Sequence, residues 1–438
     1  MTTPILDFLR RYAEGGSARL HMPGHKGRGP LGCEKYDITE IAGADDLSCP
    51  EGIIAESEKN ASVLFGTRRT FYSTEGSSQC VKAMLLLAAR RSKSRKVLAG
   101  RNAHKSFLNA CALLDLEPVW LSGEGSLCSA AITPESLRER LEGMERPCAV
   151  YITSPDYLGN MLKTGELAAV CRDFGLPLLL DGAHGAYLDA LKGPHNSCQP
   201  DLWCASAHKT LGVLTGGAYL HVSEGSAFGF EADAREALSV FGSSSPSYLI
   251  LASLDAANGR ISSGYADILN DFTVKVEGLK ARLAALGLAV EPSDPLRITI
   301  AAYKSGHTGF ELAEMLRSSK LEPEFADEDY LVLMLTPDNN LEDLGRIFAA
   351  FSPFSARIPR DPLPLSPPGE ACMTPREALL SPRVAVEARL AEGRILASAA
   401  VSCPPAIPIA VMGERLTREQ VELLPKYGVE YVDVVLEK

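Results

Sequence analysis

Short apolar runs alternate with longer stretches of helical periodicity between about Glu75 and His221. Segments with helical spacing of apolar residues, such as Gln79–Arg90 and Gly165–Phe174, separate several of these runs. Strands that alternate with helices are typical of a mostly parallel sheet covered by helices on both faces. We therefore predict an α/β fold with five buried strands, at Val97-Leu98-Ala99, Ala149-Val150-Tyr151-Ile152, Leu178-Leu179-Leu180, Leu202-Trp203-Cys204 and Ala218-Tyr219-Leu220.

The pattern changes after Phe241. Helical periodicity extends from Tyr248 to Leu286 and returns over Arg376–Gly393, whereas Leu296–Ile300 has the character of a strand. Pro353–Pro375 is rich in proline and is typical of a linker. We expect an N-terminal arm over 1–45 that begins with a short amphipathic helix, a large domain over 46–265, a small α/β domain over 266–352, a linker over 353–375 and a C-terminal part over 376–438.

Composition narrows the class of protein. The chain has 438 residues and a formal net charge of -11, which argues against nucleic-acid or anionic-membrane partners. No apolar run is long enough to span a bilayer. The eleven cysteines are scattered, with no C-x-x-C pair and no spacing typical of a zinc site. We therefore expect a cytoplasmic protein without a metal.

Two motifs at predicted strand ends carry the chemistry. Asp181 ends the apolar run Leu176–Leu180, and Lys209 lies in the polar turn Ser206-Ala207-His208-Lys209-Thr210. A lysine can hold pyridoxal 5'-phosphate as a Schiff base, and a carboxylate can pair with the ring nitrogen. Opposite charges about 4 Å apart attract by roughly 4 kcal/mol at an effective dielectric near 20. This attraction would keep the nitrogen protonated, although Asp181 could instead be a helix cap and Lys209 a solvated loop residue.

Further candidates lie at other strand and helix ends. Gly76-Ser77-Ser78 precedes a predicted helix, whose N-terminus could bind a phosphate. His104 follows the strand ending at Gly100 and could stack on a planar ring. His208 could reach a phosphate, a carboxylate or the substrate Cα, and Ser206 could donate to the phosphate. Each has a structural alternative, because Ser77 and Ser78 could simply cap the helix and His104 could lie in a solvated turn.

These motifs, taken in order, resemble the pyridoxal-phosphate-dependent ornithine/lysine/arginine decarboxylases of fold type I, in their short form without an N-terminal wing domain. The match runs nearly end to end. It rests on the following segments: His21-Met22-Pro23-Gly24-His25-Lys26, Asp37-Ile38-Thr39-Glu40, Asp45-Asp46-Leu47, Gly76-Ser77-Ser78, Arg101-Asn102-Ala103-His104-Lys105-Ser106, Ser154-Pro155-Asp156-Tyr157-Leu158-Gly159, Asp181-Gly182-Ala183-His184-Gly185, Ser206-Ala207-His208-Lys209-Thr210-Leu211, Gly393-Arg394-Ile395, Pro404-Pro405-Ala406-Ile407-Pro408 and Gly413-Glu414.

The resemblance implies an aspartate-aminotransferase-like large domain with a mostly parallel sheet, and a smaller α+β C-terminal domain. It implies that Lys209 is the Schiff-base lysine, Asp181 the pyridinium partner and His104 the stacking residue. Ser77, Ser78, Ser206 and His208 would bind or adjoin the phosphate, and His184 would lie beside the ring. After loss of carbon dioxide, His208 or Lys209 would return a proton to Cα. Such enzymes are homodimers or larger assemblies with active sites built between subunits.

The implied substrate is a basic amino acid, converted to a polyamine-pathway amine and carbon dioxide. Arginine is favoured over lysine or ornithine because the short form resembles biosynthetic arginine decarboxylases. Asp156 and Glu414 are the candidate acids for the distal cation, although either could be structural. The chain departs from the family pattern at Gly182, at Gly212-Val213 and at Ala406, and Ala406 bears on the substrate end of the pocket.

Two alternatives stay open on the sequence alone. One is another fold-type-I reaction, such as an aminotransferase or a carbon-sulfur lyase, although no motif supplies the arginine that usually clamps an aminotransferase substrate. The other is a catalytically silent paralogue that binds a polyamine or a partner protein, against which the presence of Lys209 and Asp181 argues.

Overall fold

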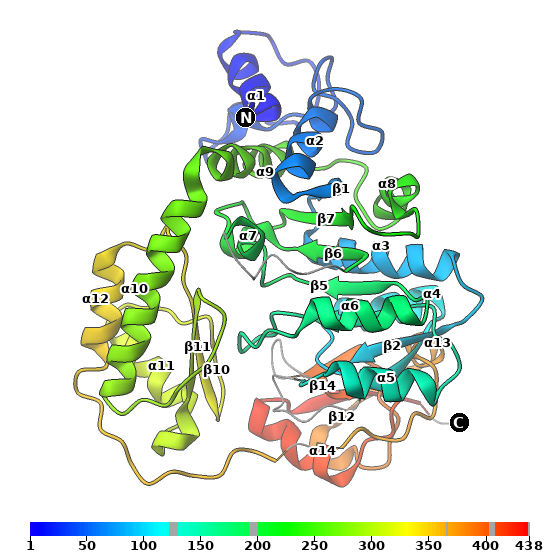
Figure 1. Cartoon of the computed structure of the whole chain (residues 1–438), viewed down its shortest axis with the longest axis vertical. Coiled ribbons are helices and arrows are strands. Elements are labelled where there is room, and N and C mark those ends of the chain that lie inside the picture. The colour runs from blue at the N-terminus through cyan, green and yellow to red at the C-terminus, as the bar shows by residue number, and fades with distance from the viewer. Residues whose placement is uncertain (122–129, 192–199, 365–366, 403–407, 437–438) are drawn as a thin grey trace. The chain divides into compact units, whose positions relative to one another are not determined.

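The computed structural model describes residues 1–121, 130–191, 200–364, 367–402 and 408–436. Contacts gather the chain into two compact units, each built from separate segments, whose elements are labelled in Figure 1. The domain boundaries expected from the sequence stay a prediction. The first unit comprises Met1–Ser94, Cys148–Ile152 and Lys163–Asp267, and the second comprises Arg95–Pro147, Thr153–Leu162 and Ile268–Lys438.

A sheet organises the first unit, with β1, β7, β6, β5 and β4 as successive neighbours. Figure 1 labels the first four of these strands in that order. β5 and β6 run parallel, whereas β7 is antiparallel to both β6 and β1. Every residue of β5 is buried, as expected for a strand covered on both faces. Because β5 and β6 are parallel, their carboxyl ends lie at the same edge of the sheet. The strands are β1 (Thr67–Ser73), β4 (Val150–Thr153), β5 (Leu178–Asp181), β6 (Leu202–Ala205) and β7 (Ala218–Ser223).

Helices cover this sheet and connect its strands. α3 packs on β1, β5, β6 and β7, and its buried side chains include those of Cys80, Met84 and Leu87. A π-helical turn at Ile261–Tyr265, in which Gly264 has φ +96°, separates α9 from the helix that follows. The helices of the unit are α1 (Pro4–Glu14), α2 (Ile53–Phe65), α3 (Gly76–Arg90), α6 (Thr164–Asp173), α7 (Ala207–Thr210), α8 (Ala234–Ser239) and α9 (Tyr248–Arg260).

The second unit contains a parallel strand pair and an antiparallel sheet. β2 (Lys96–Gly100) pairs with β3 (Glu117–Leu121), and the antiparallel strands have the order β10-β11-β9-β8. β9 is buried along its whole length. The antiparallel strands are β8 (Val290–Glu291), β9 (Arg297–Ala301), β10 (Phe325–Ala326) and β11 (Tyr330–Met334). The helices that accompany the parallel pair and the antiparallel sheet are α4 (Lys105–Leu114), α5 (Pro134–Glu142), α10 (Ala266–Ala285), α11 (Gly309–Ser318) and α12 (Leu341–Ala350).

The C-terminal part of the second unit has small elements around its own apolar cluster. β12 pairs with β15, and β13 pairs with β14, both antiparallel. Leu396, Leu424 and Val434 are fully buried members of this cluster. No helix in the described ranges is long and apolar enough to cross a membrane. The elements are α13 (Pro375–Leu380), β12 (Arg383–Glu387), β13 (Ala400–Ser402), β14 (Pro408–Val411), α14 (Arg418–Leu423) and β15 (Tyr431–Val435).

The structure confirms the five predicted strands, the N-terminal helix and the strand near Leu296–Ile300. One prediction is wrong: Arg376–Gly393 is not a single helix. The helix ends at Leu380, and Arg383–Glu387 forms β12, whose register pairs Val384 with Val434. Pro382 lacks an N–H donor and stops the helix, and the alternating Val384 and Val386 suit a strand. Ala406 and most of the predicted loop around it lie outside the described residues.

A buried carboxylate joins α1 to the body of the first unit. The Asp255 carboxylate on α9 is fully buried and accepts hydrogen bonds from the backbone N–H groups of Ile5 (2.9 Å) and Leu6 (3.0 Å). It also accepts one from the Ser57 hydroxyl on α2. The Thr3 side chain does not cap α1, so Asp255 supplies the cap from a distant part of the chain. Burial raises the pKa of Asp255 to about 6, against the lowering effect of these hydrogen bonds.

Replacing Asp255 with asparagine should therefore change stability in a pH-dependent way. An acid whose pKa is raised by folding contributes stability that is present at low pH and lost as pH rises through the folded pKa. Between pH 7 and pH 5, the free energy of unfolding should shift by about 1 kcal/mol in favour of the wild type over Asp255→Asn. Urea denaturation of both proteins at the two pH values measures this shift. An unchanged difference would contradict a raised pKa at this position.

Candidate active site

Asp181 is the last residue of β5 and Lys209 lies on α7, directly after β6. The two parallel strands deliver both residues to the same edge of the sheet in the first unit, as the sequence predicts. The Lys209 Nζ lies 2.8 Å from Nε2 of His184, which follows Asp181 by three residues. The structure therefore gathers the predicted lysine and histidine at the sheet edge where the predicted acid ends its strand.

The Asp181 carboxylate is 3% exposed and is held by neutral donors. The phenol of Tyr151 donates to Oδ2 (2.9 Å), and the backbone N–H of Ala183 donates to Oδ1 (3.1 Å). The Cys204 thiol donates to Oδ1 as well (3.4 Å). Because none of these partners is charged, the carboxylate is hydrogen-bonded while its negative charge has no cation among them. Such a group is suited to pair with a cationic ligand.

The N-terminus of α3 lies close to α7. A β-carbon placed on Gly76 would lie 4.0 Å from Cε1 of His208, and Gly76 has φ +70°, which favours glycine. The backbone N–H of Gly76 donates to the carbonyl of Gly216 (2.7 Å), and that of His208 donates to Gly217 (3.1 Å). These two bonds connect α3 and α7 through adjacent glycines. The predicted phosphate residues of the two elements therefore belong to one local framework.

This framework has the donors that a phosphate requires. Ser77 and Ser78 are partly buried in the first turn of α3, and the Glu75 side chain does not cap that helix. The buried hydroxyls of Ser206 and Thr210 have no hydrogen-bond partner within the part of the chain that the structure describes. A helix N-terminus with hydroxyls beside it is a favourable anion site. Together with Lys209 and Asp181, these residues fit pyridoxal phosphate.

The protonation state of His208 follows from its contacts. Its Nδ1 donates to the Gly217 carbonyl (3.0 Å), because a carbonyl can only accept. Burial, and to a lesser extent the charge of Lys209, lowers the pKa of His208 below its ordinary value. The imidazole is therefore neutral near pH 7 and carries its lone pair on Nε2.

Three other predicted residues, His104, Asp156 and Glu414, belong to the second unit. His104 is the N-cap of α4, where its Nδ1 accepts from the Ser106 backbone N–H (3.2 Å). The Asp156 carboxylate is buried and accepts from the backbone N–H groups of Leu158 (3.0 Å) and Asn160 (2.9 Å). These contacts support a structural contribution from His104 and Asp156. Their predicted contacts with cofactor and substrate stay predictions.

Glu414 forms a buried, bidentate ion pair with Arg101 in the second unit. The Arg101 Nη1 lies 2.7 Å from Oε1 and its Nη2 lies 2.8 Å from Oε2. The two side chains are only 11% and 3% exposed, and the guanidinium also stacks over Trp120. Since the carboxylate already has a guanidinium partner, this geometry supports a structural role for Glu414 more directly than a role in substrate binding.

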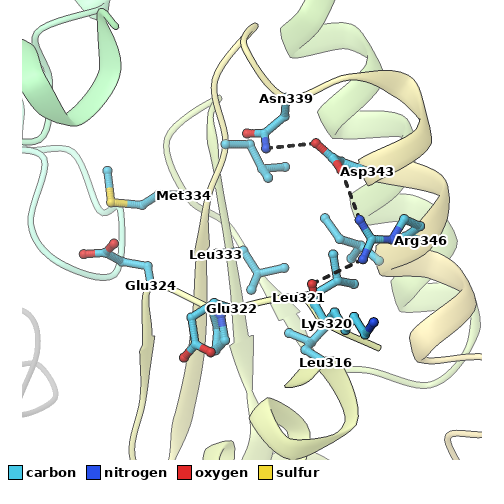
Figure 2. Close-up of a pocket in the computed structure, with 13 residues that line it drawn as sticks. Leu316, Lys320, Leu321, Glu322, Glu324, Leu333, Met334, Asn339, Asp343 and Arg346 are labelled. Atoms are coloured by element: carbon cyan, nitrogen blue, oxygen red, sulfur yellow. Dashed lines mark hydrogen bonds and ion pairs between the residues drawn. The ribbon is translucent and has the colours of Figure 1, made fainter. Parts of the chain in front are cut away.

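A separate pocket of about 460 Å³ lies between α11, β11 and α12 (Figure 2). The Arg346 side chain, which lines this pocket, donates to the carbonyls of Ser319 (3.0 Å) and Lys320 (3.2 Å). It also approaches the Asp343 carboxylate (Figure 2). The pocket contains none of the site residues that the sequence predicts. In the described ranges, no group of three or more histidine, cysteine, aspartate or glutamate residues is placed to hold a metal.

The structure adds residues that the sequence did not indicate as functional. Tyr151 was expected only as part of a strand and Cys204 only as a core residue, yet both donate to Asp181. Thr210 adds a buried hydroxyl next to Lys209. In the sequence, Tyr151 and Cys204 differ from their strand neighbours only in carrying a polar group within an apolar run. That difference points to Asp181 only once the order of β4, β5 and β6 is known.

Comparisons with known proteins agree with this geometry. Residues 3–284 match the family model described as "Orn/Lys/Arg decarboxylase, major domain". The chain is 31% identical to the uncharacterized protein YaaO of Bacillus subtilis (97% of this chain, 94% of the relative) and 27% identical to a B. subtilis arginine decarboxylase (97% and 93%). A Francisella novicida lysine decarboxylase, LdcF, superposes with a TM-score of 0.81 at 17% identity, over 99% of this chain and 81% of that one. This likeness confirms the predicted fold class.

The ion pair between Arg101 and Glu414 allows a test of whether Glu414 is structural. Glu414→Gln should lower the free energy of unfolding by about 3 kcal/mol, because it leaves a buried guanidinium without its counter-charge. In a cycle of the wild type, Arg101→Leu, Glu414→Leu and the variant with both changes, the double variant should lose less stability than the two single leucine variants together. Urea denaturation of the four proteins measures the coupling.

The exposed pair Arg418–Glu422 is the matched control, and Glu422→Gln should change stability little. If Glu414→Gln kept full stability while the KM for a basic amino acid rose steeply, Glu414 would be a substrate residue instead.

Proposed function

Because the chain belongs to the Orn/Lys/Arg decarboxylase family, we propose that it decarboxylates a basic amino acid with pyridoxal 5'-phosphate bound at the Lys209–Asp181 edge of the sheet. The observation that carries this proposal is that Lys209 and the buried Asp181 carboxylate, whose described hydrogen-bond partners are neutral, lie at the same edge of one sheet. The family match, and the arginine decarboxylase of B. subtilis that matches over 93% of its own length, favour decarboxylation over transamination or carbon-sulfur cleavage.

When bound, pyridoxal phosphate supplies an electron sink for the bond between Cα and the carboxylate carbon. Asp181 would hold a proton at the ring nitrogen, because its negative charge lacks a cationic partner among its contacts. The first turn of α3, with Ser77 and Ser78, would bind the phosphate together with Ser206 and Nε2 of His208. Lys209 would hold the cofactor through Nζ, and His104 would stack on its ring.

A proton must return to Cα after carbon dioxide leaves. The Nδ1 of His208 is bonded to a backbone carbonyl and its ring is neutral, so only Nε2 remains for a ligand. If Nε2 serves the phosphate, Lys209 is the better placed donor, and His184 at 2.8 Å can exchange a proton with its Nζ. We therefore assign the proton return to Lys209.

Arginine is our first choice of substrate. The support is the arginine decarboxylase of B. subtilis, which matches 97% of this chain. The net charge of -11 also favours the approach of a cationic substrate. Lysine and ornithine remain competing substrates, and a cytoplasmic location remains a prediction from the sequence.

Release of carbon dioxide from arginine, lysine, ornithine and leucine tests both the reaction and its substrate. The wild-type protein with pyridoxal phosphate should act on a basic amino acid, with arginine preferred, and leave leucine unchanged. Lys209→Ala should fold, lose the visible absorbance of the bound cofactor and lose turnover on the order of 10³-fold or more. Lys163→Ala, at an exposed lysine of the same unit, is the control and should match the wild type. Equal turnover of leucine, or full activity of Lys209→Ala, would contradict the proposal.

We further propose that the enzyme acts as a homodimer. The N-terminal segment exposes three large apolar side chains, Leu20 (94%), Met22 (67%) and Leu31 (81%), which suits a surface that a second copy covers. Leu31→Asp should therefore weaken the dimer and lower activity at low protein concentration. Val274→Asp, at an exposed valine of α10, is the control. Sizing under turnover that found a fully active monomer would contradict this proposal.

A further inference from the structure

Asp181 lies between two strands that each direct a donor at its carboxylate. In the parallel register of β5 and β6, Cys204 is directly opposite Asp181, so their side chains project from the same face of the sheet. Tyr151 comes from β4, the neighbour of β5 on its other side. The thiol therefore reaches Oδ1 (3.4 Å) and the phenol reaches Oδ2 (2.9 Å), one on each oxygen.

The Cys204 thiol keeps its proton, and a tyrosine phenol is ordinarily neutral near pH 7. Burial raises the pKa of the Cys204 thiol well above its ordinary value, and the negative charge of Asp181 raises it further. Tyr151 and Cys204 are fully buried, so water does not compete for these contacts. As donors, the phenol and the thiol favour the anionic form of the carboxylate, and each such hydrogen bond makes that anion a weaker base.

The basicity of Asp181 decides where a shared proton resides. Against a pyridine nitrogen, a weakly basic carboxylate leaves the proton on the ring, whereas a strongly basic one draws it onto its own oxygen. Only the protonated ring is a strong electron sink. The number and strength of the hydrogen bonds to Asp181 therefore bear directly on the rate.

We propose that Tyr151 and Cys204 are positioning residues that keep Asp181 weakly basic and correctly oriented, and so keep the proton on the cofactor's ring nitrogen. The inference rests on the proposed function, because it requires pyridoxal phosphate at this sheet edge. Neither residue touches the reacting atoms in this account. They act through Asp181, and the backbone N–H of Ala183 supplies a third donor that mutation does not remove.

The test uses the full-length protein with bound pyridoxal phosphate whose ring nitrogen carries an isotope label. The nitrogen resonance, recorded without substrate across a pH series, reports whether the ring is protonated. In the wild type it should be protonated at neutral pH. In Tyr151→Phe the loss of that proton should move to lower pH, and kcat should fall about tenfold with KM nearly unchanged. Asp181→Asn gives the limiting case of a ring without its carboxylate.

The control for Tyr151→Phe is Tyr219→Phe. Tyr219 is equally buried in the same unit, and its phenol donates to Asn258 (2.9 Å), so its loss removes a buried hydrogen bond without touching Asp181. Tyr219→Phe should match the wild type in nitrogen resonance and in kcat. If Tyr151→Phe and Tyr219→Phe both lose thermal stability, but only Tyr151→Phe changes the nitrogen resonance, then the change at the ring does not come from the loss of stability.

A second pair keeps the inference testable if Tyr151→Phe does not fold. Cys204→Ala removes the thiol donor, whereas Cys204→Ser replaces it with a hydroxyl. The serine variant should keep the ring protonated, and the alanine variant should shift its titration in the same direction as Tyr151→Phe. Cys171→Ala, at another buried cysteine of the unit, is the control.

The outcomes separate this inference from the proposed function. If the wild type neither binds pyridoxal phosphate nor releases carbon dioxide, the proposed function fails. If the wild type does both, but Tyr151→Phe and Cys204→Ala leave the nitrogen titration and kcat unchanged, the inference alone is overturned. A fall in kcat with an unchanged titration would also overturn it, because the two residues would then act by packing and not through the proton.

Discussion

The candidate site in the first unit depends on one negative charge at the end of an apolar strand. β5 is buried along its whole length and ends in a carboxylate that is only 3% exposed. A buried anion is costly unless it is hydrogen-bonded or paired with a cation. The neighbouring strands meet this requirement in part, with a phenol from β4 and a thiol from β6. The order of the strands and the register between β5 and β6 are therefore constraints on the site as well as on the sheet.

Three other buried acids of this chain are each paired with a cation. Glu58 pairs with Arg235, Asp294 with Arg297, and Glu414 with Arg101. Each of these pairs brings its own cation and so completes a structural contact within its unit. The described partners of Asp181 are neutral, which leaves its charge to be matched by something that the chain binds. Asp255 also has only neutral donors among its described partners, so neutral partners alone do not mark a binding acid. Asp181 differs from it in lying at the same sheet edge as Lys209.

The sequence could predict what is local. An apolar run with an acid at its end and a lysine after the next run together predicted Asp181 and Lys209 at one sheet edge, since parallel strands share that edge. The sequence missed β1 because Thr67–Ser73 begins with polar residues, and its pairing with β7 is decided by tertiary packing. It also mistook Arg383–Glu387 for helix, although Pro382 stops the preceding helix and the alternating Val384 and Val386 suit the strand that pairs with β15.

What escaped the sequence depends on register and on long-range pairing. Tyr151 lies 30 residues before Asp181, and Arg101 lies 313 residues before Glu414. No local spacing in the sequence indicates either contact. Tyr151 was therefore expected only as part of a strand, and Glu414 was a candidate to bind the distal cation of the substrate. A side chain gains a role in such a site through the strand or loop that happens to lie opposite it. The placement of Lys209 and Asp181 at one sheet edge can therefore be inferred from the sequence, whereas the residues that donate to Asp181 become visible only when the sheet is assembled.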